Sequence, residues 1–149
     1  LRIPAGSFTE NDADCLPTGT VLSVEGTPFD FRAAKPVGRD IGADDGQLAI
    51  GHGYDHNFAL SGRDAAELYS PESGVAMNIT TDMPGVQLYT ANFLECIPGK
   101  RGALMEPHGA VCLETQEFPD AVHHADFPSP VLRAGAAYHR ETELTFDVR

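Results

Sequence analysis

One glutamate of this chain stands where a catalytic base would be useful. The apolar run Ala110–Leu113 leads into Glu114, and Pro119 ends the stretch. If the stretch is a strand, alternation puts Glu114 on the same face as Cys112 and Gln116. Burial makes a carboxylate hold its proton more tightly, so a buried glutamate can accept a proton near neutral pH. The plainer interpretation is a surface glutamate, or one that backbone donors satisfy.

Three further residues could bind a polar ligand. Asp55 lies where a glycine-rich loop meets a strand, a place where side chains reach ligands, although an Asx turn or a loop cap is the simpler interpretation. Gln87 and Tyr89 alternate onto one face of another strand and offer an amide and a flat aromatic surface. Such a pair suits a sugar, which has hydroxyls at its edge and C–H faces for stacking. Core packing is the ordinary alternative for Tyr89.

A metal site is the competing chemistry for the histidines near Asp55. His52 and His56 lie four residues apart, but glycines at positions 51 and 53 argue against the helix that gives this spacing its usual meaning. No third ligand is fixed by the sequence. We therefore expect no metal, and no nucleophile motif such as G-x-S-x-G is present.

Composition and charge exclude several classes of partner. The 149 residues carry 22 acids and 10 Lys or Arg residues, a formal charge of −12, which repels phosphate backbones, so we expect no nucleic acid partner. No run of 18 apolar residues exists, and we expect no membrane span. Three cysteines without a C-x-x-C pair indicate free thiols and a cytoplasmic location. The start at Leu1, in what resembles the middle of a strand, indicates a processed or incomplete end.

The elements that must position these residues are short strands. The chain has 15 glycines and 11 prolines and almost no helical periodicity, which predicts an all-β antiparallel sandwich or barrel with residues 1–149 as a single domain. We expect a turn at 16–19 and a long irregular connection at 33–53. The loop 95–109 has room for one short helical turn. The expected strands cover residues 20–25, 64–70, 75–82, 86–91 and the stretch before Glu114, with a short alternating piece at 29–32.

The last strand shows the clearest alternation in the sequence. The alternation predicts that its apolar side chains, together with one threonine, point inward and that its charged side chains point outward. The residues expected to point inward are Tyr138, Thr142, Leu144, Phe146 and Val148.

Four segments, taken together and in order, resemble the motifs of the aldose 1-epimerases (galactose mutarotases). They are Gly26–Phe31, Gly53–Phe58, Pro84–Phe93 and Leu113–Ala121. The resemblance runs from about residue 15 to the C-terminus. It implies a large antiparallel β-sandwich, the galactose mutarotase-like supersandwich, of which this chain is the C-terminal portion.

The resemblance also implies a function and roles. The expected reaction is the interconversion of the α and β anomers of a free aldohexose such as glucose or galactose, without metal or redox cofactor. A glutamate takes the proton of the C1 hydroxyl while a histidine protonates the ring oxygen. The glutamate falls on Glu114, the aspartate that binds sugar hydroxyls on Asp55, and a residue lining the site on Gln87.

One departure from the family qualifies this expectation. The family's acid histidine, a second sugar-binding histidine and an arginine belong to an N-terminal half that this chain does not match. We therefore expect the N-terminal half of the same protein as a partner. Two alternatives stay open: a carbohydrate-binding module without catalysis, and a relative that acts on a phosphorylated sugar, which needs a basic phosphate site.

Overall fold

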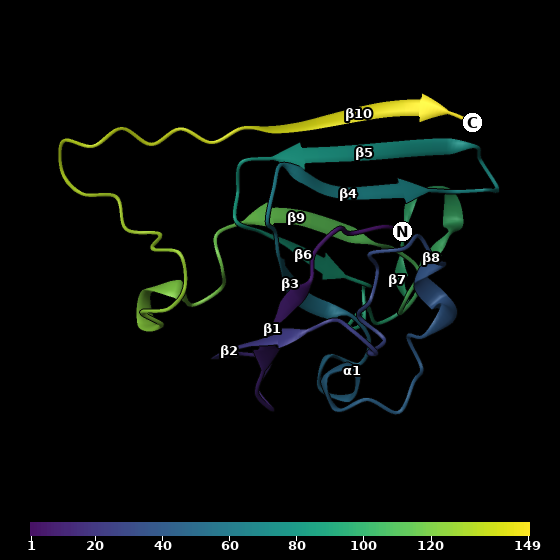
Figure 1. Cartoon of the computed structure of the whole chain (residues 1–149). Coiled ribbons are helices and arrows are strands. Elements are labelled where there is room, and N and C mark those ends of the chain that lie inside the picture. Colours follow the sequence, from purple (N-terminus) through teal and green to yellow (C-terminus); the bar gives the residue numbers. More distant parts are fainter.

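The computed structural model describes residues 1–149 and shows an all-β fold with one short helix (Figure 1). One antiparallel sheet has, in spatial order, β2 (Pro17–Ser23), β1 (Ser7–Asn11), β3 (Asp55–Ala59), β6 (Gly85–Tyr89) and β9 (Cys112–Gln116). A second sheet has the order β10 (Thr142–Val148), β5 (Val75–Thr81) and β4 (Asp64–Tyr69). The predicted hairpin of residues 64–70 and 75–82 is confirmed.

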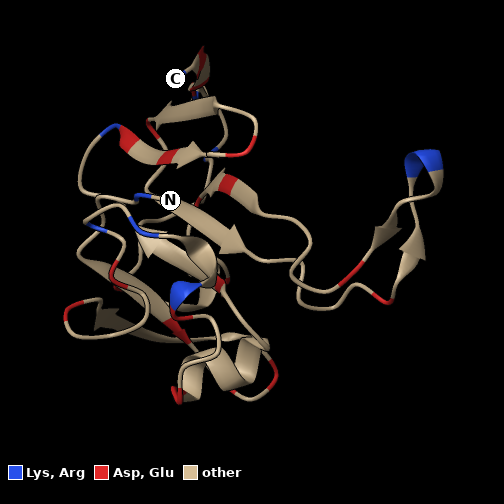
Figure 2. Ribbon diagram, turned by 90° about the vertical axis from the view of Figure 1, so that its right-hand side faces the viewer, with Lys and Arg blue, Asp and Glu red and all other residues tan.

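The remaining elements are small. β7 (Ile97–Pro98) and β8 (Leu104–Met105) form a hairpin around the 3-10 turn η2 (Lys100–Gly102). Figure 2 shows this hairpin projecting from the rest of the molecule with basic residues at its tip. The other helical elements are α1 (Gly46–Gly51), η1 (Val37–Arg39) and η3 (Ala121–His123). None of the helices has the length and hydrophobicity needed to cross a bilayer.

Helix α1 lies inside the connection that the sequence predicted to be irregular. Asp45 caps its first turn by accepting hydrogen bonds from the backbone N–H groups of Gln47 and Leu48. His52 ends the helix in the left-handed conformation. With six residues, the helix is too short to show the 3.6-residue period in its sequence.

Two local predictions near the N-terminus are wrong. The turn expected at 16–19 lies earlier, because the Asp12 carboxylate accepts hydrogen bonds from the backbone N–H groups of Asp14 and Leu16, and β2 begins at Pro17. The piece at 29–32 is not a strand. Its backbone is folded into consecutive turns, and Phe29 and Phe31 are both fully buried. The alternation there arises because Phe29 and Phe31, two residues apart, both pack into the core.

The core joins the two large sheets. Phe58 and Leu88 contribute from the five-stranded sheet, and Ala66 and Ile79 from the three-stranded sheet, all within one cluster of buried side chains. Rings from the N-terminal segment fill the space between them; Phe29 stacks on Phe8, of β1, with ring centroids 4.2 Å apart. The same core therefore fixes one face of β3 and β6 and leaves their other face available.

The side chains of the last strand that were predicted to point inward are not buried. Leu144, Phe146 and Val148 are 50%, 65% and 75% exposed. Phe146 is paired with Met77 and Leu144 with buried Ile79, so these side chains do lie on the core side of their sheet. They are exposed because β10 is the edge strand, beyond the reach of the shared core (Figure 1). Tyr138 lies before the strand and is also exposed.

Candidate functional site

Three adjacent strands bring the predicted site residues together. In the register of β3 with β6, Asp55 lies opposite Tyr89 and Asn57 opposite Gln87; in that of β6 with β9, Gln87 lies opposite Glu114. Directly opposite residues of antiparallel strands share a face. These polar side chains therefore stand on one side of the sheet, while the intervening residues of β3 and β6 are buried in the core on the other.

The side chains surround one open hollow of about 380 Å³. This volume lies in the range of small-molecule sites. Its lining includes all four residues predicted from the sequence and three others: Asp55, Gln87, Tyr89, Phe93, Glu114, Gln116 and Pro119. The hollow thus combines carboxylates, amides and aromatic rings.

Asp55 and Gln87 are joined by a short hydrogen bond. Gln87 donates from Nε2 to Asp55 Oδ1 at 2.7 Å, and Gln116 donates from Nε2 to Gln87 Oε1 at 3.0 Å. The Asp55 backbone is held as well, because its carbonyl accepts from Asn11 Nδ2 at 3.0 Å and its N–H donates to His56 Nδ1 at 3.1 Å. The carboxylate of Asp55 is therefore oriented by its neighbours and is not part of an Asx turn.

Glu114 is exposed, and the structure gives its side chain no hydrogen bond or ion pair. The plainer interpretation of the sequence, a surface glutamate, is therefore the one that the structure has, and the burial considered beside it does not occur. The physical reason is its position: β9 is the edge strand of the five-stranded sheet, and Glu114 stands on the face that the core does not cover. Its carboxylate is free to contact a ligand in the hollow.

Two aromatic rings form the apolar part of the lining. Tyr89 and Phe93 lie nearly parallel, with ring centroids 6.5 Å apart and an interplanar angle of 18°. Phe93 donates its backbone N–H to Tyr89 Oη at 3.2 Å, which ties the loop after β6 to the strand. Phe93 remains 53% exposed, so its ring is open to a ligand as well as to solvent.

His56 supports the site from the core. It is fully buried, its Nδ1 accepts from the Asp55 N–H, and its Nε2 therefore carries the proton that is donated to Gln47 Oε1 at 3.1 Å. Burial lowers the pKa of His56 from 6.5 to about 4, so the ring is neutral near pH 7. Both ring nitrogens are occupied by these bonds, so His56 does not share a metal site with His52, which packs against Phe93. No cluster of three potential ligands occurs in the structure.

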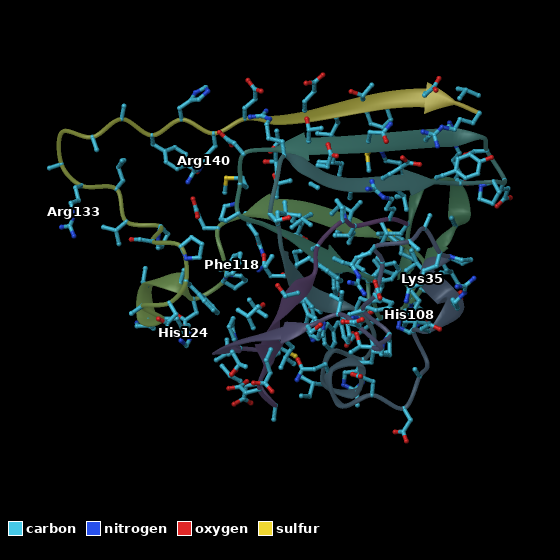
Figure 3. The ribbon with its side chains drawn as sticks, in the orientation of Figure 1. Lys35, His108, Phe118, His124, Arg133 and Arg140 are labelled. Carbon is cyan, nitrogen blue, oxygen red and sulfur yellow. The ribbon has the colours of Figure 1, made fainter.

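Sequence reasoning missed three residues of the lining. Gln116 had a signal, because strand alternation places it on the face of Glu114. Phe93 and Pro119 lie in loops beyond β6 and β9, where alternation no longer predicts direction. The segment after Pro119 packs against β2 and β3, because the His124 ring lies beside Gly19 and the cluster that contains Phe118 packs with Ala59 (Figure 3).

Comparison with known proteins identifies several relatives. The sequence pattern of the aldose 1-epimerase family matches residues 1–145. The chain is 40% identical over 153 residues to a galactose mutarotase of Bos taurus, which covers 99% of this chain and 43% of that protein.

Two solved structures share the fold. The GalM/aldose epimerase homologue from C. elegans superimposes with a TM-score of 0.86 at 31% identity, covering 99% of this chain and 45% of the other. The galactose 1-epimerase from Lactobacillus acidophilus gives a TM-score of 0.79 at 26% identity, covering 99% and 43%. The predicted antiparallel all-β fold of the mutarotase type is confirmed. The chain spans less than half the length of the relatives that it matches.

Proposed function

The chain belongs to the aldose 1-epimerase family, and on that premise we propose that it supplies the base and part of the sugar pocket of an isomerase. The substrate class is a free aldohexose such as glucose or galactose, and the reaction interconverts its α and β anomers. Neither a metal nor a redox cofactor is needed, because the reaction consists of proton transfers, the breaking and re-forming of the C1–O5 bond, and a bond rotation.

One observation carries the proposal. Asp55, Gln87, Tyr89 and Glu114 come from three strands and line one hollow of about 380 Å³. A sugar needs acceptors and donors for its hydroxyls and a flat apolar surface for its C–H face. The hollow presents both, with a free carboxylate among them.

The proposed mechanism assigns each group a task. Asp55 and Gln87 bind sugar hydroxyls, and the rings of Tyr89 and Phe93 face the C–H surface. Glu114 removes the proton of the C1 hydroxyl while an acid protonates the ring oxygen, so the C1–O5 bond breaks. Rotation about the C1–C2 bond presents the other face of the C1 carbonyl to O5. Closure then re-forms the C1–O5 bond, Glu114 returns its proton to the C1 oxygen, O5 gives its proton back to the acid, and the second anomer results. Each positioned acid or base contributes about 10²–10⁴ to the rate.

The acid is proposed to come from the N-terminal half of the same protein. No histidine lines the hollow, which is open rather than enclosed. The exposed apolar side chains Leu144, Phe146 and Val148 offer that half a surface to cover. On this proposal, residues 1–149 act as one domain that completes its pocket by contact with the other half.

A cytoplasmic location is part of the proposal. Cys15, Cys96 and Cys112 are all free thiols, and two of them are exposed. Exposed free thiols persist best in a reducing compartment.

Polarimetry tests the function directly. The decay of optical rotation of fresh α-D-galactose should be accelerated by the complete protein, and Glu114→Gln should lower the acceleration by about 10²–10⁴. Glu143→Gln is the matched control, because Glu143 is an exposed glutamate of β10 outside the hollow. Calorimetry should show that Glu114→Gln still binds galactose. Equal acceleration by the parent and Glu114→Gln would remove Glu114 from the mechanism.

A second candidate is a carbohydrate-binding module without catalysis. The absence of a histidine from the lining favours it, since binding needs only the groups that the hollow already has. Galactose binding without any acceleration by the complete protein would establish this alternative. A phosphorylated substrate is disfavoured, because neither lysine nor arginine lines the hollow. Tighter binding of galactose 6-phosphate than of galactose would reverse that preference.

A further inference from the structure

Two polar side chains meet above a glycine in the middle strand of the site. Gly85 of β6 lies opposite Gln116 of β9 on one side and opposite Ala59 of β3 on the other. A Cβ added at Gly85 would lie 2.2 Å from Oδ1 of Asn57, so the Asn57 amide occupies the space that a side chain would need. Gln116 reaches across the same space and donates from Nε2 to Asn57 Oδ1 at 3.2 Å.

These contacts continue to the two side chains that are proposed to bind sugar hydroxyls. Asn57, Gln116, Gln87 and Asp55 form a side-chain network across three strands: Gln116 Nε2 also donates to Gln87 Oε1, and Gln87 Nε2 donates to Asp55 Oδ1. Asn57 is 1% exposed, so this end of the network is anchored in the protein interior. The other end, Asp55, lines the hollow.

The chemistry of the groups fixes the direction of every bond in the network. An ionised carboxylate only accepts hydrogen bonds, so Gln87 must turn its Nε2 toward Asp55 and its Oε1 away. That oxygen then needs a donor, which Gln116 supplies. Both N–H bonds of Gln116 are committed, one to Gln87 and one to Asn57. Gln116 therefore has no donor left for a ligand, whereas Gln87 keeps one N–H and Asp55 keeps Oδ2.

We propose that Gln116 is a positioning residue that fixes the amide orientation of Gln87 and, through it, the carboxylate of Asp55 for sugar binding. The effect on sugar binding rests on the proposed function. The orientation of the Gln87 amide rests on the geometry of the network alone. Without the donor on Gln116, the Gln87 amide loses the partner that holds Oε1, and it is free to rotate away from Asp55. The sugar hydroxyls are then bound by side chains, Gln87 and Asp55, that are no longer held in the binding orientation.

The structural part is tested by NMR without any sugar. Glutamine occurs at positions 47, 87 and 116 of this chain, so glutamine-selective ¹⁵N labelling of the complete protein gives a small set of side-chain amide signals to assign for it. In Gln116→Met, which keeps the length of the side chain but has no donor, the Gln87 amide signals should move toward those of a mobile glutamine. Gln116→Glu should act in the same direction, because a carboxylate cannot donate to Oε1. Unchanged Gln87 signals in both variants would overturn the proposal.

The functional part is tested by a double-mutant cycle on galactose affinity. Gln116→Met alone should weaken binding about tenfold, the effect of one lost hydrogen bond. Adding Gln116→Met to Gln87→Met should change little further, because Gln116 acts through Gln87. Cys112→Ala is the control: Cys112 lies on the same strand and face as Gln116, is exposed and does not line the hollow. Its affinity should equal that of the parent.

The outcomes separate the two proposals. Additive losses in the cycle would show that Gln116 acts on the sugar directly, and the positioning role would be wrong. If the parent protein binds no galactose, the proposed function fails, and the Gln87 signals in the Gln116 variants alone decide whether the network exists. Moved amide signals together with a non-additive cycle would support the positioning role.

Discussion

The buried neutral histidine beneath the site gives the sharpest prediction about stability. His56 is fully buried and packs edge-on against the stacked rings of Phe8 and Phe29, and burial lowers its pKa from 6.5 to about 4. Asp45 opposes this shift, but its effect is smaller than that of burial. We expect the folded protein to lose stability as the pH falls from 6.5 toward 4. In this range His56 is protonated in the unfolded chain but stays neutral in the folded protein, so acid favours the unfolded state.

The magnitude follows from the two pKa values. Each pKa unit corresponds to about 1.4 kcal/mol, so the interval from 6.5 to about 4 amounts to about 3 kcal/mol of stability. Above pH 6.5 the histidine is neutral in both states and contributes no pH dependence. Below about pH 4 it is protonated in both states, and the full loss has been reached. His56 therefore makes the unfolding free energy depend on pH only between pH 6.5 and about pH 4.

The assay is urea unfolding at pH 7.5, 6.0 and 5.0 for the parent and for His56→Gln. Glutamine offers Gln47 a hydrogen-bonding partner and has no charge to gain in this range. The difference in unfolding free energy between parent and variant should shrink by about 2 kcal/mol from pH 7.5 to pH 5.0. An NMR titration of the His56 ring should show that it stays neutral at pH 5.0, which tests the same point if His56→Gln unfolds too readily.

A difference between parent and variant that is constant with pH would refute this reasoning. It would mean that His56 takes up its proton in the folded state as easily as in the unfolded state. The hydrogen bond from Asp55 N–H to Nδ1 would then have to break near pH 6.5, and the orientation of β3 at the site would change with pH.

Two further predictions concern the lining and its support. Phe93→Ala should weaken galactose binding about two- to tenfold without lowering the unfolding temperature, since Phe93 lines the hollow and is 53% exposed; equal affinity in calorimetry would remove the ring from the pocket. Gly85→Ala should destabilise the protein by about 1–3 kcal/mol, because the added Cβ would lie 2.2 Å from Asn57 Oδ1. In urea unfolding, Gly62→Ala is the control with open space at its Cβ, and equal stability of the two variants would contradict the crowding at Gly85.

The strands around the site were predictable because their alternation is local. Glu114 and Gln116 were placed on one face of a strand, Gln87 and Tyr89 on one face of another, and the structure has β9 and β6 there. The hairpin of β4 and β5 was predictable from its turn residues for the same reason. At Phe29 and Phe31 the same reasoning failed, since two anchors in consecutive turns give the same alternation as a short strand.

Burial was less predictable than direction. The side chains of Leu144 and Phe146 lie on the core side of their sheet, as alternation requires, yet they are exposed. Glu114 likewise lies on the predicted face but is not buried. In both cases the cause is an edge strand, and the position of a strand within its sheet depends on pairings that a single segment does not encode.

The sequence by itself determined the chemical groups and the faces on which they stand, because the two-residue period of a strand is a property of the local backbone. Only the tertiary structure decided that Asp55, Gln87 and Glu114 are neighbours, since that depends on the pairing and register of β3, β6 and β9. The same holds for the meeting of Asn57 and Gln116 above Gly85. Such contacts between distant segments are set by the packing of a common core, which selects the one register that buries Phe58 and Leu88 together.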